Sequence, residues 1–156
     1  MSTDLRDVTD ADLPTLFEFQ RDPVASRMAA FVSKDPSDRA AFDAHWKKLR
    51  NDPAIVLKAI VEDGRLAGSV ARWDLAGKPQ VTYWIGREFW GRGIATRALA
   101  AFLEIVTVRP LYASAASDNA SSLRVLEKCG FRRTGEETAF APGRGGEIVE
   151  VFLELS

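Results

Sequence analysis

The chain has too few cysteines and histidines for a disulfide framework or a metal centre. Its 156 residues include one cysteine, Cys129, and one histidine, His45. A single thiol cannot form an internal disulfide, which fits a reducing, cytoplasmic compartment. A lone histidine cannot build a metal site without partners, so we interpret His45 either as a helix residue or as part of a pocket wall. Cys129 is interpreted as a buried residue rather than a nucleophile.

The chain also lacks an excess of charge and any long apolar run. Its 21 basic and 22 acidic residues leave a formal charge of −1, so no basic field favours nucleic acid or an anionic membrane. No run reaches membrane-spanning length, and charged residues interrupt the first positions where a signal peptide would be apolar. With 46% hydrophobic and 28% charged residues, the composition indicates a soluble globular protein. We expect one domain over residues 1–156.

Apolar periodicity predicts a mixed α/β domain with a central twisted sheet of about seven strands and with four helices. The expected strands are Leu5–Val8, Ala54–Val61, Arg65–Leu75, Val81–Ile85, Leu111–Ser117, Phe131–Phe140 and Glu147–Leu155. The expected helices are Ala11–Arg21, which Pro23 ends, Ser37–Arg50, a helix from about Ala95 to Val106, and Ala120–Cys129, which Gly130 caps. Residues 76–79 are expected to form a turn.

One stretch carries most of the functional signal. The strand at Val81–Ile85 is followed by the loop Gly91-Arg92-Gly93 and then by a helix. A loop that enters a helix through glycines leaves the first backbone N–H groups unpaired, and the helix dipole adds positive potential there. Such a helix start can bind a phosphate or pyrophosphate, and Arg87, Arg92 and Arg97 flank it as sources of charge.

Two other interpretations of this loop are weighed. The glycines could form a tight turn that binds no ligand. The loop also resembles the start of a dinucleotide fingerprint, but Thr96 stands where the third glycine belongs. No acidic residue closes a second strand about 20 residues further on, so the dinucleotide interpretation is rejected.

Three separated blocks resemble the GNAT N-acetyltransferase superfamily, and within it the RimJ/RimL branch. These blocks are Tyr83–Ile85, Trp90–Thr96, and Asn119–Ser122 followed by Lys128–Phe131. The superfamily's loop pattern is Gln/Arg-x-x-Gly-x-Gly/Ala, and here Trp90 takes its first position. That residue departs from the general pattern and fits the RimJ/RimL branch. The resemblance covers nearly the whole chain.

The resemblance implies a GNAT fold in which the strands Val81–Ile85 and Leu111–Ser117 run parallel and splay apart. The co-substrate would be acetyl-coenzyme A, whose pantetheine arm lies in that cleft like a short extra strand. The residues expected to contact it are Trp84, Ile85, Trp90, Gly91, Arg92, Gly93, Ile94, Ala95, Thr96, Asn119 and Arg124.

The same resemblance implies the reaction chemistry. The backbone N–H of Ile85 would face the thioester carbonyl and stabilise the oxyanion that forms when an amine attacks. Many relatives carry a tyrosine as general acid seven residues after the asparagine, where this chain has Leu126. Ser122, three residues after Asn119, matches a serine that is a candidate acid in the RimJ/RimL branch; the alternative is a helix residue that satisfies backbone groups. Glu136 and Glu137 are candidate bases, with a water relay as the alternative.

We thus predict direct transfer of acetyl to a primary amine, either a protein N-terminus or a small molecule. The alternative is a regulatory or structural module that binds coenzyme A without turnover. A homodimer is a further expectation, because Glu147–Leu155 alternates apolar and acidic residues and could pair across a sheet edge.

Overall fold

The computed structural model describes residues 2–156, which form a seven-stranded mixed sheet with five α-helices. The strands are β1 (Thr3–Arg6), β2 (Val56–Glu62), β3 (Arg65–Leu75), β4 (Lys78–Ile85), β5 (Leu111–Ala116), β6 (Arg132–Ala141) and β7 (Gly146–Leu155). The α-helices are α1 (Leu13–Arg21), α2 (Pro23–Ala29), α3 (Arg39–Asn51), α4 (Ile94–Ile105) and α5 (Ala120–Lys128), and short 3₁₀ turns are η1 (Asp10–Asp12) and η2 (Arg87–Phe89). The predicted mixed α/β class and the seven strands are confirmed.

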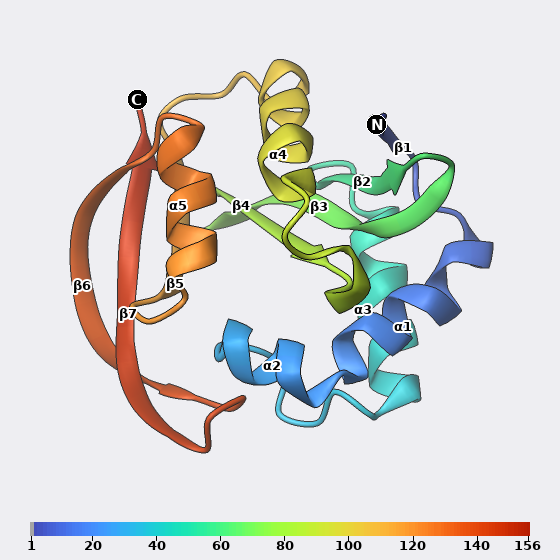
Figure 1. The fold of residues 1–156 in the computed structure, drawn as a ribbon, viewed down its shortest axis with the longest axis horizontal. Coiled ribbons are helices and arrows are strands. Elements are labelled where there is room, and N and C mark those ends of the chain that lie inside the picture. The colour runs from blue at the N-terminus through green and yellow to red at the C-terminus, as the bar shows by residue number, and fades with distance from the viewer. Residues whose placement is uncertain (1) are drawn as a thin grey trace.

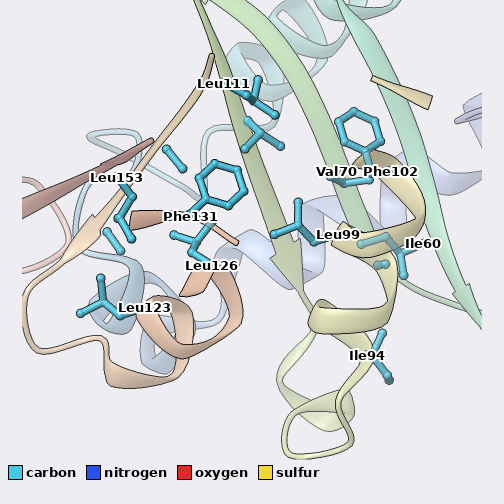
Figure 2. Close-up of a cluster of buried hydrophobic side chains, with 14 of the residues drawn as sticks. Ile60, Val70, Ile94, Leu99, Phe102, Leu111, Leu123, Leu126, Phe131 and Leu153 are labelled. Carbon is cyan, nitrogen blue, oxygen red and sulfur yellow. The ribbon is translucent and has the colours of Figure 1, made fainter. Parts of the chain in front are cut away.

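Helices cover both faces of the sheet (Figure 1). The larger core lies between the strands and α4 and α5, and Figure 2 shows its side chains meeting there. Its fully buried members include Leu99 and Phe102 of α4 and Leu126 of α5. A second core joins α1 and α3 to the opposite face, around Phe17 and Trp46. No helix within residues 2–156 is both long and apolar enough to cross a membrane.

The structure has one helix more than the four predicted. Pro23 does end α1, but it also begins α2. The side chain of Asp22 accepts a hydrogen bond from the backbone N–H of Val24 at 3.0 Å, and this caps the new helix. Proline is favoured in the first turn of a helix, because its fixed φ suits the helix and its missing N–H has no partner there. The sequence-based prediction treated Pro23 only as a stop.

The expected edge role of the last strand is wrong. The strand order is β1-β2-β3-β4-β5-β7-β6, so β7 pairs on both sides. It lies antiparallel to β5 on one side and to β6 on the other, and the sheet edges are β1 and β6. Because β7 lies between β5 and β6, its backbone groups are hydrogen-bonded on both sides within the sheet. It therefore has no free edge with which a second copy could pair.

The hairpin between β3 and β4 is tighter than predicted. Ala76 and Gly77, with φ of 52° and 79°, make the whole turn, and β4 begins already at Lys78. Two residues with positive φ give the turn whose twist matches that of the flanking strands. The longer β4 pairs with β3 along its full length, from Leu75–Lys78 to Gly68–Ile85.

The predicted splay between two parallel strands is confirmed. β4 and β5 pair only at Gln80 and Tyr112, near the start of each strand. Beyond this pair the strands diverge toward their C-terminal ends, which lead into η2 and α4 on one side and into α5 on the other. The sheet is therefore open where the two helix starts come closest to it.

Candidate functional site

The backbone of β4 provides one wall of the open cleft. The N–H of Gly86 donates to the carbonyl of Ala67 in β3 at 2.8 Å. Backbone groups alternate in direction along a strand, so those of Trp84 also face β3, whereas those of Tyr83 and Ile85 face β5. Because β5 has already diverged, Tyr83 and Ile85 present their backbone groups to the cleft. Trp84, by contrast, has its main chain committed to β3.

Only one of the two backbone groups of Ile85 remains available. Its carbonyl accepts a hydrogen bond from the indole N–H of Trp90 at 2.9 Å. Trp90 follows η2, so the loop that leads to α4 folds back and fixes the end of β4. The Ile85 N–H is then the donor that this residue leaves facing the cleft, and a backbone N–H of this kind can polarise a carbonyl oxygen.

The glycines of the loop shape the start of α4. Gly91 and Gly93 have φ of 76° and 74°, a left-handed conformation that non-glycine residues rarely adopt. Gly93 is the N-cap and provides no side-chain acceptor, and the first helical hydrogen bond runs from Arg97 N–H to the Gly93 carbonyl. The N–H groups of residues 94–96 therefore have no partner within the helix. This is the predicted anion-binding geometry.

The three arginines around this loop differ from their predicted common role. The guanidinium of Arg97 donates to Glu62 at 3.1 Å and to the hydroxyl of Thr3 at 2.9 Å, and the Glu62 side chain is only 2% exposed. Its third bond holds the Arg92 carbonyl at 2.9 Å. Arg97 is thus neutralised by a buried carboxylate and anchors the loop to β1 and β2. Arg87 pairs with Asp22 at 2.9 Å. Within residues 2–156, Arg92 has no carboxylate partner.

The first turn of α5 forms the opposite side of the cleft. Asn119 caps the helix, with its side-chain oxygen accepting from the Ser122 N–H at 3.2 Å. Its amide group donates to no residue in the described part of the chain. The Ser122 hydroxyl lies 2.7 Å from the hydroxyl of Tyr83. Burial raises the pKa of Tyr83 to about 12, although the hydrogen bond with Ser122 acts in the opposite direction.

Arg124 does not lie with these residues. It follows Ser122 by two positions, which turns its side chain about 200° around the helix axis. It lines a groove of about 560 Å³ together with Lys128 and with Arg133 of β6. The structure therefore separates Arg124 from the face of α5 that carries Ser122.

Carboxylates gather on the other face of the sheet, which α1–α3 partly cover. Glu150 of β7 pairs in register with Ala116, the last residue of β5, and with Glu137 of β6. Its carboxylate accepts a hydrogen bond from the Ser114 hydroxyl at 2.7 Å. Among residues 2–156 no cation pairs with Glu137 or Glu150. Glu136 pairs with the core residue Val151 in register and so lies on the other face.

The side chain of Trp84 also belongs to this face. It alternates with Tyr83 and Ile85, both of which pack on the core beneath α4 and α5. The indole nitrogen of Trp84 is buried and has no hydrogen-bond partner within residues 2–156. A buried donor without an acceptor is uncommon in folded proteins, so this position favours contact with a further polar group.

Helix α2 lies near the ends of both splayed strands. At its start Asp22 binds Arg87, which follows β4. At its other end the loop between β6 and β7 packs against it, with the Gly143 N–H donating to the Ala30 carbonyl at 2.8 Å. Arg144 of that loop binds both oxygens of Asp118 at 2.8 Å and lowers the pKa of this carboxyl. A pocket of about 500 Å³ lies between α2, Asp118 and Arg144.

The single histidine and the single cysteine differ in their surroundings. His45 is exposed on α3. Burial raises the pKa of the Cys129 thiol, which disfavours the thiolate that a nucleophile requires. The described residues contain no group of histidine, cysteine and carboxylate side chains that could hold a metal ion.

Solved structures share this fold. Mycobacterium smegmatis RimJ, in complex with CoA-disulfide, matches at 20% identity with a TM-score of 0.82, over 98% of this chain and 81% of that one. A phosphinothricin acetyltransferase from Sinorhizobium meliloti, in complex with AcCoA, matches at 19% identity with a TM-score of 0.82, over 99% of this chain and 88% of that one. The spermidine N-acetyltransferase from Vibrio cholerae, in complex with CoA and spermine, matches at 18% identity with a TM-score of 0.78, over 97% of this chain and 95% of that one.

Sequence comparison identifies the family independently of the fold. No curated protein matches the chain at a significant level. The family model described as "Acetyltransferase (GNAT) domain" matches residues 3–132, a span that includes the splayed strands, the glycine loop and α5. The chain therefore belongs to the GNAT family of acetyltransferases.

Proposed function

We propose that the protein is an acetyl-coenzyme A-dependent N-acetyltransferase that transfers acetyl directly from the thioester to a primary amine. The observation that carries this proposal is the cleft itself. A parallel strand pair opens after a single residue pair, next to a helix start with unpaired N–H groups. An extended arm with two amides and a pyrophosphate matches both features, since backbone groups bind the former and the helix start binds the latter.

Each element of the cleft has a role in this proposal. The N–H groups from Gly91 to Thr96 hold the pyrophosphate, with Arg92 as the cation nearest to it in sequence. The amide group of Asn119 donates to the pantetheine arm. The Ile85 N–H donates to the thioester carbonyl and more strongly to the oxyanion, a contribution of about 3 kcal/mol in comparable sites. Ser122 is the proposed donor to the leaving sulfur.

The acceptor reaches the thioester from the face that α1–α3 partly cover, because α4 and α5 border the co-substrate on the other face. The acceptor is a protein N-terminus or a small amine; of these, a polyamine is the amine that the spermidine N-acetyltransferase structure holds, as spermine. The carboxylates of Glu137 and Glu150 on this face suit an acceptor that arrives as an ammonium ion.

The test of the function is calorimetric titration with acetyl-coenzyme A, followed by thiol release with a panel of amines and short peptides. Binding together with release for a subset of acceptors is the expected result. Binding without release for any acceptor would favour a coenzyme A-binding module without turnover, for which the leucine at position 126 is the supporting feature. Absence of binding would reject the assignment of the glycine loop.

We further propose that Glu150 accepts the proton of the acceptor amine. Its position in register with Ala116 places it at the open end of β5, and Ser114 orients its carboxylate. Glu150→Gln keeps the shape and the Ser114 contact but removes the base. The expected result is a fall in kcat of about 100-fold, the usual size of a lost general base, with unchanged affinity for acetyl-coenzyme A.

The matched control for Glu150 is Glu154→Gln. Glu154 lies on the same strand and face but pairs with Tyr112, where β4 and β5 are still joined. It should retain full activity. Equal activity of both variants would reject Glu150 as the base and favour a water relay.

A further inference from the structure

Tyr83 is a half-buried ionisable residue that the expected chemistry leaves unused, and its hydroxyl has a specific partner, the Ser122 hydroxyl. Its side chain leaves β4 on the face of α4 and α5 and reaches the first turn of α5. We infer that the Tyr83 and Ser122 hydroxyls act as a linked pair of donors, in which Tyr83 donates to Ser122 and Ser122 donates to the leaving sulfur. This inference rests on the proposed function and assigns Tyr83 as a positioning residue.

The Ser122 hydroxyl is held from two sides. Its own backbone N–H is fixed by the Asn119 cap at 3.2 Å, and its oxygen lies 2.7 Å from the Tyr83 oxygen. The Tyr83 hydroxyl can also donate to the Ser122 carbonyl at 3.3 Å, the longer of its two contacts with Ser122. Tyr83 offers one proton. When it donates this proton to the Ser122 hydroxyl oxygen, across the shorter contact of 2.7 Å, the Ser122 hydroxyl proton is free to point elsewhere. This first turn of α5 borders the cleft between β4 and β5, and we assign the free proton to that side.

The neighbouring positions on α5 supply no alternative hydroxyl. Leu126, one turn further along, is 1% exposed and belongs to the apolar core. The Cys129 thiol donates to the carbonyl of Thr96 at 3.7 Å, and burial raises the pKa of this thiol. Tyr83 and Ser122 are thus the hydroxyls that β4 and the facing side of α5 bring together.

The pair stabilises the leaving group by hydrogen bonding and transfers no net proton. When the amine nitrogen bonds to the carbonyl carbon, the carbonyl π electrons move to oxygen and form the oxyanion. Collapse of the oxyanion re-forms the carbonyl and breaks the carbon–sulfur bond, whose electron pair stays on sulfur. The proton lost by nitrogen leaves by the acceptor side. A hydroxyl whose pKa lies near 12 stays protonated through the range in which the enzyme can be assayed, so it donates without ionising. Activity should therefore show no alkaline loss from Tyr83 below about pH 11.

The experiment compares Tyr83→Phe, Ser122→Ala and the double variant. We expect kcat to fall about 5-fold for Tyr83→Phe and roughly 30-fold for Ser122→Ala, as for a lost neutral hydrogen bond and a lost bond to a charged group. The double variant should match Ser122→Ala within about 2-fold, because Tyr83 acts only through Ser122. Affinity for acetyl-coenzyme A, measured by calorimetry, should remain unchanged in all three.

Tyr112→Phe is the matched control, since the chain has only these two tyrosines. Tyr112 lies on β5, and its alternation with the core residues Leu111 and Ala113 places it on the other face. Full activity in Tyr83→Phe, or multiplied losses in the double variant, would overturn the linked pair. The unsubstituted protein is assayed before the variants. If it binds acetyl-coenzyme A but acetylates no amine, the proposed function is rejected, independently of the linked pair.

Discussion

Gly93→Asp is expected to weaken binding of acetyl-coenzyme A by at least about 100-fold while the protein stays folded. The substitution places a carboxylate at the start of α4, where the proposed pyrophosphate accepts from the N–H groups of residues 94–96. Two like charges about 4 Å apart near a protein surface repel by roughly 4 kcal/mol. Titration calorimetry with acetyl-coenzyme A measures the loss, and circular dichroism checks the fold.

The backbone at Gly93 requires a control that separates charge from strain. Its φ is 74°, and an added Cβ would approach the Arg97 guanidinium at 3.1 Å. Gly93→Asn introduces the same shape and the same left-handed backbone, which asparagine tolerates as well as aspartate does. We expect Gly93→Asn to bind far more tightly than Gly93→Asp. Equal losses would show that backbone shape rather than the anion site controls binding, and unchanged affinity in both would reject the site.

Local sequence signals predicted the features of the cleft that depend on short segments. The glycines at 91 and 93 specify the turn into α4, and the alternation at Val81–Ile85 specifies β4. The splay followed from the family resemblance, because strand pairing between distant segments has no local signal. The core positions of α4, such as Leu99 and Phe102, follow the helical spacing of its apolar residues.

The features that sequence reasoning missed depend on long-range contacts. Arg97 was expected to flank the loop as a source of charge, but its partner Glu62 lies 35 residues away, and only the fold brings them together. The contact between Tyr83 and Ser122 spans 39 residues. Tyr83 belongs to the sequence block Tyr83–Ile85, but a sequence motif does not show on which face of a strand a side chain lies or which residues it contacts there.

The same limit explains why the last strand was expected at a sheet edge. The pattern of β7 alternates apolar and acidic residues, which is typical of a strand with one solvated face at the centre or at the edge of a sheet. Sheet order decides between them, and no residue of β7 encodes it alone. Glu150 was not predicted for the same reason. Its proposed role as a base depends on its register with Ala116, and its neighbours in sequence do not indicate that register.

Gly68→Ala is expected to have the largest effect on stability of any single methyl group added near the cleft. Gly68 lies in β3 opposite Ile85, and an added Cβ would stand 1.9 Å from the Trp84 carbonyl oxygen and 3.1 Å from the Ile85 Cα. These are backbone atoms, so no side-chain rotation relieves the overlap, and the two strands must separate or change register. We expect a loss of about 3 kcal/mol in the free energy of unfolding, measured by urea titration.

The same substitution should also impair catalysis, because β3 fixes the direction of the Ile85 N–H. A shift of about 1 Å in a positioned group can cost roughly 100-fold in rate, so kcat should fall even under conditions where the variant is folded. Gly135→Ala is the control: Gly135 also lies in a strand, β6, and like Gly68 has no positive φ, but no atom lies within 4 Å of its added Cβ. It should change stability by less than about 0.5 kcal/mol. If the two variants proved equally stable and active, β3 could not be the element that holds Ile85 in place, and the oxyanion role would have to rest on the Trp90 contact alone.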